Sequence, residues 1–153
     1  KIILVLLMFI GACAGSTGGG FKISRLLILC KAIPKQLSLV IHPREVKVIR
    51  MDGKPIDHNT LRSTNVYLAI YFFILLVSTL LISVDNFNLT TNFTAVASTL
   101  NNIGPGLDGV GPTRNFGMYS DFSKFVLMFD MLAGRLELYP LLILFMPSLW
   151  RRK

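Results

Sequence analysis

Charged residues are scarce in this chain of 153 residues. Asp, Glu, Lys and Arg together make up 16% of the sequence, whereas a soluble domain usually carries about 25%. Hydrophobic residues, by contrast, make up 52%. This combination excludes an ordinary soluble domain and predicts a protein embedded in a membrane.

Cysteine and histidine are also rare, with two of each. Cys13 and Cys30 lie in or beside apolar segments, so we expect small apolar fillers rather than a disulfide pair. No cluster of cysteine and histidine has the spacing of a zinc site, and no Ser/His/Asp or Cys/His set is available for nucleophilic catalysis. The sequence therefore predicts neither an enzyme nor a protein with a resident metal or cofactor.

Acidic residues number 8 against 16 basic ones, and the two kinds are unevenly placed. Basic residues gather in residues 31–65 and 151–153, whereas residues 85–123 hold three aspartates and one arginine. Because these regions alternate with apolar segments, the charge predicts orientation in a membrane and not nucleic-acid binding. By the positive-inside rule, we expect the 34–65 loop and the C-terminus in the cytoplasm and residues 85–123 outside.

The apolar segments have two different lengths. Residues 66–84 form 19 residues without a charge, and residues 124–150 are also long enough to span a bilayer, although they contain several charged residues. The run at residues 2–10 would cover about 14 Å as a helix, which is roughly half of the hydrocarbon core. This shorter run cannot span.

Each of two glycine-rich stretches follows a half-length helix. The first, GACAGSTGGGFK, begins directly after residues 2–10, and the second, GPGLDGVGP, follows a helix predicted at residues 91–101. Non-helical backbone inside a bilayer is tolerated where it lines a water-filled path or is buried in protein, and glycine permits such conformations. Glycine can also serve close helix packing, but two copies of one arrangement favour an ion pore.

The repeated plan is a span, a re-entrant half-length helix, a glycine-rich loop and a second span. It predicts an all-α membrane protein built from such units around a central pore. The first copy lacks its leading span, so we expect at least one more span upstream of Lys1. Within the basic loop, EVKVIRMDGKPI predicts a short hairpin with Asp52-Gly53 at its turn. The chain divides into a first pore segment, a cytoplasmic linker, a complete pore unit and a cytoplasmic tail, at residues 1–33, 34–65, 66–150 and 151–153.

Three motifs resemble those of a known family. GACAGSTGGGFK with HPREV, then STLNNIGPGLDGVGPT, then LAGRLELYPLLILF resemble the C-terminal part of the TrkH-type potassium uptake proteins, in the right order and over residues 1–150. The loop NIGPG favours this family over the related KtrB proteins. The resemblance implies four span–pore-helix–span units around one pore, of which this chain would hold the end of the third and all of the fourth.

The resemblance also implies functional residues. Main-chain carbonyls of two filter strands would bind potassium, the substrate, and these strands are Cys13, Ala14, Gly15 and Ser16, and Asn102, Ile103, Gly104 and Pro105. A gate below the filter would begin at Gly18, Gly19, Gly20 and Lys22 and be braced by Arg135. A charged residue in mid-span is a functional hypothesis in its own right. Helical spacing favours a partner for Arg135 on another segment over Asp130 or Glu137.

The implied function is potassium uptake across a bacterial inner membrane. The resemblance implies a homodimer that works with a cytoplasmic nucleotide-binding regulator of the TrkA type. The basic loop is either a docking surface for that regulator or membrane-surface charge that only sets topology. Two other hypotheses remain: a non-conducting membrane scaffold or orphan fragment of such a transporter, and a membrane enzyme, which the lack of a catalytic set disfavours.

Overall fold

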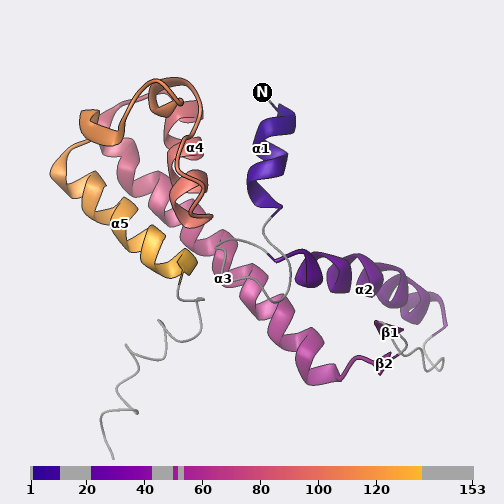
Figure 1. The fold of residues 1–153 in the computed structure, drawn as a ribbon. Coiled ribbons are helices and arrows are strands. Elements are labelled where there is room, and N and C mark those ends of the chain that lie inside the picture. The colour runs from indigo at the N-terminus through magenta and orange to yellow at the C-terminus, as the bar shows by residue number, and fades with distance from the viewer. Residues whose placement is uncertain (1, 11–21, 43–49, 52–53, 136–153) are drawn as a thin grey trace, which may run out of the picture.

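The structure, a computed structural model, describes residues 2–10, 22–42, 50–51 and 54–135. Within these residues the regular secondary structure is helical apart from one small hairpin (Figure 1). The α-helices are α1 (Ile2–Phe9), α2 (Ile23–Ile41), α3 (His58–Ile82), α4 (Leu89–Leu100) and α5 (Asp121–Arg135). Short 3-10 turns are η1 (Ser83–Asp85), η2 (Asp108–Val110) and η3 (Phe116–Met118), and the hairpin strands are β1 (Arg50–Met51) and β2 (Lys54–Pro55).

The longest helical stretch joins α3 to η1. Asn59–Asp85 form 27 residues that, by length and composition, are the one stretch in the described part of the chain able to cross a membrane. A helix of that length measures about 40 Å, which exceeds the ~30 Å hydrocarbon core. The helix predicted at residues 66–84 is confirmed. It begins earlier because the polar residues before it also fold as helix, with Thr64 Oγ1 donating to the Thr60 carbonyl at 2.9 Å.

The half-length helix predicted at residues 91–101 is confirmed as α4, within two residues at each end. Most of α4 is buried against α3 and α5, although many of its side chains are polar. Thr94 Oγ1 donates to the Thr90 carbonyl at 2.7 Å, and Thr99 Oγ1 donates to the Ala95 carbonyl at 3.0 Å. These bonds within the helix satisfy the hydroxyl groups, so a polar helix can be buried at low cost.

After α4 the chain reverses and returns along the same helix. The N–H of Leu107 donates to Thr94 Oγ1 at 3.0 Å, and that of Gly109 donates to Thr91 Oγ1 at 3.3 Å. Later residues of the return segment thus meet earlier residues of α4, which defines a re-entrant hairpin of helix and loop. Gly109 is required by this close approach, since a Cβ there would lie 2.8 Å from the Thr91 methyl group.

The end of α4 also meets α5 closely. At Gly134 of α5, an added Cβ would overlap the carbonyl oxygen of Leu100, the last residue of α4. The core formed by α3, α4 and α5 includes Tyr71, Ile82, Val96, Leu100 and Leu127. The outer face of α5 instead exposes large apolar side chains, among them Phe125.

Part of the basic region is helical. α2 continues through Pro34 to Ile41 and so includes the first residues assigned to the cytoplasmic linker, whose boundary at residue 34 stays a prediction. Proline removes one helical hydrogen bond, but apolar residues recur at helical spacing on both sides of it, at Ile33, Leu37 and Val40. The predicted hairpin is confirmed, because Arg50 pairs with Pro55 and Met51 with Lys54, which leaves a two-residue connection. The turn residues themselves lie outside the described residues.

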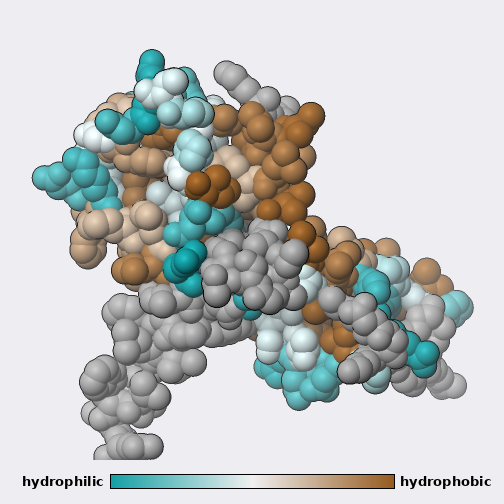
Figure 2. All heavy atoms as spheres, viewed as in Figure 1, coloured by the Kyte–Doolittle hydropathy of each residue, from teal (hydrophilic) through white to brown (hydrophobic). Residues whose placement is uncertain are grey.

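Large apolar side chains are exposed on several helices. Leu6 of α1, Val40 of α2 and Phe73 of α3 are 60%, 79% and 68% exposed. Figure 2 shows apolar surface over α1 and beside the start of α2, while hydrophilic residues gather at the loop ends of the molecule. Contiguous apolar surface of this kind is rare on soluble monomers and fits contact with lipid or with other membrane segments.

Replacing Gly134 with alanine is expected to separate α5 from α4, because the added methyl would overlap main-chain atoms of Leu100. Overpacking a tight contact costs about 1–3 kcal/mol, so the full-length protein should melt at a lower temperature in detergent. Gly117→Ala is the matched control, since the atoms nearest to its methyl would belong to the Asn115 side chain and not to the main chain. Equal melting temperatures for the two variants would contradict the contact.

Candidate functional site

The turn after α4 contains Asn102–Pro105, the one of the two predicted filter strands that the structure describes. Asn101 caps the helix, and its N–H bonds to the Ala97 carbonyl at 3.1 Å. The next residue, Asn102, has a φ of 54°, and Gly104 has a φ of 110°. Asparagine is one of the few residues other than glycine that tolerate the left-handed region, and a φ of 110° strongly favours glycine. These two conformations turn the chain sharply at the helix end.

The backbone of the turn is hydrogen-bonded at both ends, but its carbonyl groups have no hydrogen-bond partner among the described residues. The N–H of Ile103 donates to the Ser98 carbonyl at 2.9 Å, and that of Gly106 donates to the Val110 carbonyl at 2.8 Å. The four carbonyls of Asn102–Pro105 accept no hydrogen bond from any residue that the structure describes. Because Ile103, Gly104 and Pro105 are also exposed, this short stretch presents free carbonyl oxygens at the end of a buried helix.

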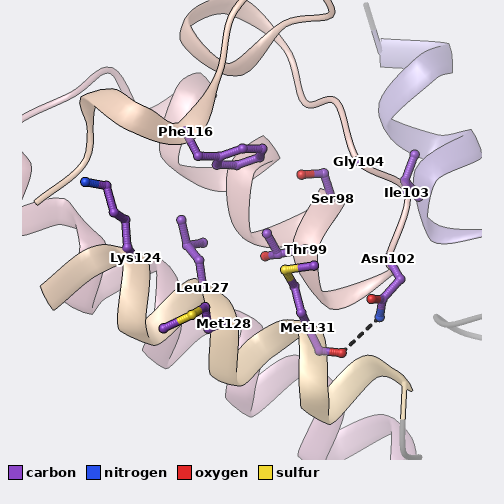
Figure 3. A pocket seen from close by; sticks show the side chains of 10 residues that line it. All are labelled: Ser98, Thr99, Asn102, Ile103, Gly104, Phe116, Lys124, Leu127, Met128 and Met131. Atoms are coloured by element: carbon purple, nitrogen blue, oxygen red, sulfur yellow. Dashed lines mark hydrogen bonds between the residues drawn. The ribbon is translucent and has the colours of Figure 1, made fainter. Parts of the chain in front are cut away.

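Two cavities border the turn. One of about 480 Å³ lies between the turn and α5 (Figure 3). Its lining residues are Ser98, Thr99, Asn102, Ile103, Gly104, Phe116, Lys124, Leu127, Met128 and Met131. The other, of about 500 Å³, is lined by Asn102, Met128, Met131, Leu132 and Arg135. The structure therefore brings Asn102, predicted for the filter, and Arg135, predicted for the gate, to the same cavity.

Other predicted residues are not brought together. Cys13–Ser16 and Gly18–Gly20 lie outside the described residues. Lys22 is described and lies immediately before α2, whereas Arg135 is the last residue of α5. Cys30 is a free cysteine on α2 and its side chain is exposed, so it does not fill space in the described core, and Cys13 lies outside the described residues.

Arg135 does not pair with Asp130. One carboxyl oxygen of Asp130, Oδ1, accepts a hydrogen bond from Ser78 Oγ at 2.7 Å, and the other, Oδ2, is buried without a partner among the described residues. This agrees with the helical spacing argument, because positions five apart on a helix do not face each other. The alternative partner Glu137 lies outside the described residues.

The buried pair of Ser78 and Asp130 is a feature that sequence reasoning missed. Asp130 is completely buried on α5, and Ser78 is buried on α3. A buried carboxyl group requires hydrogen-bond partners, so the serine explains how α5 tolerates it at this position. The signal available in the sequence was the placement of both polar residues within apolar runs.

Together, the long apolar helix, the buried half-length helix and the unpaired turn are the features expected of a membrane transport protein with a re-entrant segment. Residues 1–152 match the family model of TrkH, a cation transport protein. The chain belongs to the TrkH family of cation transport proteins. This membership confirms the resemblance, and it places the chain among transporters and not among enzymes.

Named relatives support the same family. The Trk system potassium uptake protein TrkH of Vibrio parahaemolyticus is 39% identical over 98% of this chain, and that of Escherichia coli is 37% identical over the same share. The crystal structure of the potassium transporter TrkH from Vibrio parahaemolyticus matches with a TM-score of 0.86 and 38% identity over 98% of this chain. The chain spans 30% and 31% of the two relatives and 32% of the solved chain.

Replacing Ser78 with alanine is expected to destabilise the protein, because both oxygens of the buried Asp130 carboxyl would then lack a described partner. An unsatisfied buried polar group costs about 1–3 kcal/mol, which a lower melting temperature in detergent would report. Thr79→Val is the control, since the Thr79 hydroxyl donates to the Leu75 carbonyl of its own helix, at 2.7 Å, and to no other helix that the structure describes. Wild-type stability of Ser78→Ala would rule out a stabilising role for the pair.

Proposed function

We propose that the chain forms the end of the third and all of the fourth pore unit of a TrkH-type potassium transporter. Potassium would enter from outside, exchange its water shell for filter carbonyls, pass a gate and reach the cytoplasm. Potassium is the substrate, and no resident cofactor is needed. Family membership supports cation transport, and the names of the relatives as potassium uptake proteins support the choice of potassium.

The unpaired carbonyls of Asn102–Pro105 are the observation that carries the proposal. Carbonyl oxygens can replace the hydration shell of a potassium ion. The end of α4 adds to this, because the C-terminus of a helix carries the negative end of its dipole and stabilises cations. Glycine at position 104 permits the left-handed turn that leaves these carbonyls free.

The placement of α1 supports a second, equivalent strand. The short helices α1 and α4 stand on the same side of α3 (Figure 1) and contact each other through Phe9 and Phe93, whose ring centroids are 6.0 Å apart. Cys13–Ser16 follow α1 as Asn102–Pro105 follow α4. We therefore assign Cys13, Ala14, Gly15 and Ser16 to the third filter strand.

The proposed topology places the chain in a bacterial inner membrane as a multi-pass protein. The hairpin and the start of α3 lie at one end of the molecule, and the loops with η2 and η3 lie at the other (Figure 1). With residues 34–65 and 151–153 in the cytoplasm and residues 85–123 outside, the basic loop would face a cytoplasmic regulator of the TrkA type. A homodimer completes the proposed assembly.

The proposed gate joins Gly18, Gly19, Gly20 and Lys22 to a brace at Arg135. Two observations support Arg135 in this role. It lines a cavity with Asn102, next to the proposed filter, and no carboxylate of the described residues lies within ion-pair distance of it. A guanidinium group in this position is available to hold main-chain carbonyls of a gate loop.

A non-conducting scaffold or orphan fragment is the second candidate. The chain spans about a third of its relatives and would supply two of the four expected filter strands. The two candidates differ in one measurable property, since only the transporter restores potassium uptake when the complete gene is expressed.

Gly104→Val is expected to abolish uptake, because a β-branched residue resists a φ of 110° and the turn would have to change shape. The assay is growth on limiting potassium of a bacterium that lacks its own potassium uptake systems. Gly117→Val, in the outer loop and without a left-handed φ, is the control and should grow like wild type. Immunoblots of membranes confirm insertion. Normal growth of Gly104→Val would remove this turn from the filter, and Gly15→Val tests the other strand in the same way.

Arg135→Ala is expected to raise basal ion flux, because the gate loop would lose its brace. A loss of about 1 kcal/mol changes an open-to-closed ratio about fivefold, which rubidium tracer uptake into proteoliposomes can resolve. Arg114→Ala removes the same charge from the exposed outer loop and should leave the flux unchanged. Flux at or below the wild-type level in Arg135→Ala would exclude the gate role.

A further inference from the structure

Two adjacent asparagines follow the last residue of α4, and their side chains form hydrogen bonds with two different helices. The Oδ1 atom of Asn101 accepts a hydrogen bond from the hydroxyl of Tyr71 on α3, at 2.9 Å. The Nδ2 atom of Asn102 donates to the carbonyl of Met131 on α5, at 3.1 Å (Figure 3). The backbone that enters the proposed filter is thus tied to α3 through one residue and to α5 through the next.

Tyr71 is itself held firmly in place. Its side chain is 2% exposed, and the ring of Tyr67 stacks beside it with centroids 6.4 Å apart. Phe9, the last residue of α1, meets the same ring edge-on, also with centroids 6.4 Å apart. Buried aromatic contacts of this kind leave a ring little freedom, so the position of the Tyr71 hydroxyl is determined by its packing. Tyr71 therefore contacts the ends of both half-length helices.

Asn102 combines a left-handed backbone conformation with a side-chain hydrogen bond. Its backbone has a φ of 54°, which asparagine tolerates better than most residues, and its amide supplies the donor for Met131. Asn101 likewise uses both ends of its amide, because its Nδ2 donates to the Ala97 carbonyl at 2.8 Å while its Oδ1 accepts from Tyr71. Each amide therefore has a defined orientation.

We propose that Tyr71 and the Asn102 side chain are positioning residues that hold the fourth filter strand at the spacing that prefers potassium over sodium. This inference rests on the proposed function. The carbonyls of Asn102–Pro105 have no described partner of their own, so their positions depend on the anchors beside them. When the anchors loosen, the carbonyls can close around the smaller sodium ion, and the preference for potassium falls.

The chain contains a matched control for the Tyr71 bond. At the other end of α4, the hydroxyl of Tyr119 donates to Oδ1 of Asn92 at 2.9 Å, and this bond is also buried. Burial raises the pKa of Tyr119 to about 12, so its hydroxyl remains a donor at neutral pH. The two tyrosine–asparagine bonds hold the same helix, but only that of Tyr71 lies next to the proposed filter.

The test compares Tyr71→Phe with Tyr119→Phe in the purified full-length protein, reconstituted into proteoliposomes. Rubidium tracer uptake is measured in competition with potassium and with sodium, and the ratio of the half-inhibiting concentrations reports the ion preference. Loss of one hydrogen bond should lower the preference of Tyr71→Phe for potassium about fivefold. Tyr119→Phe should keep the wild-type ratio.

Asn102→Gly provides the second variant. Glycine retains the left-handed backbone and the main-chain carbonyl but removes the amide donor to Met131. A fall in ion preference of similar size would assign the effect to the lost tether and not to backbone strain. Melting temperatures of all variants are recorded, since a purely structural role would lower stability without changing the ratio.

Two results would overturn the inference. One is a wild-type ion preference in both Tyr71→Phe and Asn102→Gly, and the other is an equal change in Tyr71→Phe and Tyr119→Phe. Failure of the proposed function gives a different outcome, because the wild-type protein would then carry no rubidium, or Gly104→Val would conduct normally. The two failures are thus distinguished within one set of liposomes.

Discussion

A helix that ends within the membrane leaves its last carbonyls, and the backbone after it, without the partners that a longer helix would provide. The surroundings of α4 meet part of this requirement. Threonine hydroxyls of α4 accept the N–H groups of the returning chain, and Asn101 bonds back to Ala97. In the described part of the chain, the carbonyls of Asn102–Pro105 form a run left unpaired, at the position proposed to bind a cation.

Glycine serves three separate physical purposes around this turn. At Gly104 it permits a left-handed backbone, at Gly109 it lets the return segment lie against α4, and at Gly134 it lets α5 approach the main chain of Leu100. A single explanation for the glycine content, such as helix packing alone, would therefore miss two of the three. These three glycines let one re-entrant segment bend, return and pack within a small space.

The parts of the fold with a local signature were predictable from the sequence. A charge-free run indicates α3, a short helix before glycines indicates α4, and an Asp-Gly pair indicates the hairpin. The extension of α2 through Pro34 was not predicted from the sequence. The helix continues there because the loss of one hydrogen bond at the proline matters less than the apolar residues that recur at helical spacing on both sides of it. The bonds of Ser78 to Asp130 and of Tyr71 to Asn101 were also missed. They join positions 52 and 30 residues apart, and such contacts leave no periodic pattern in a single sequence.

The contact at Gly134 has a mechanical consequence. It lies one residue before Arg135 and presses α5 against the backbone at the end of α4, with no side chain between them to absorb movement. The turn proposed to bind the ion is therefore held against α5 in two ways, by the hydrogen bond of the Asn102 side chain to Met131 and by the close approach at Gly134.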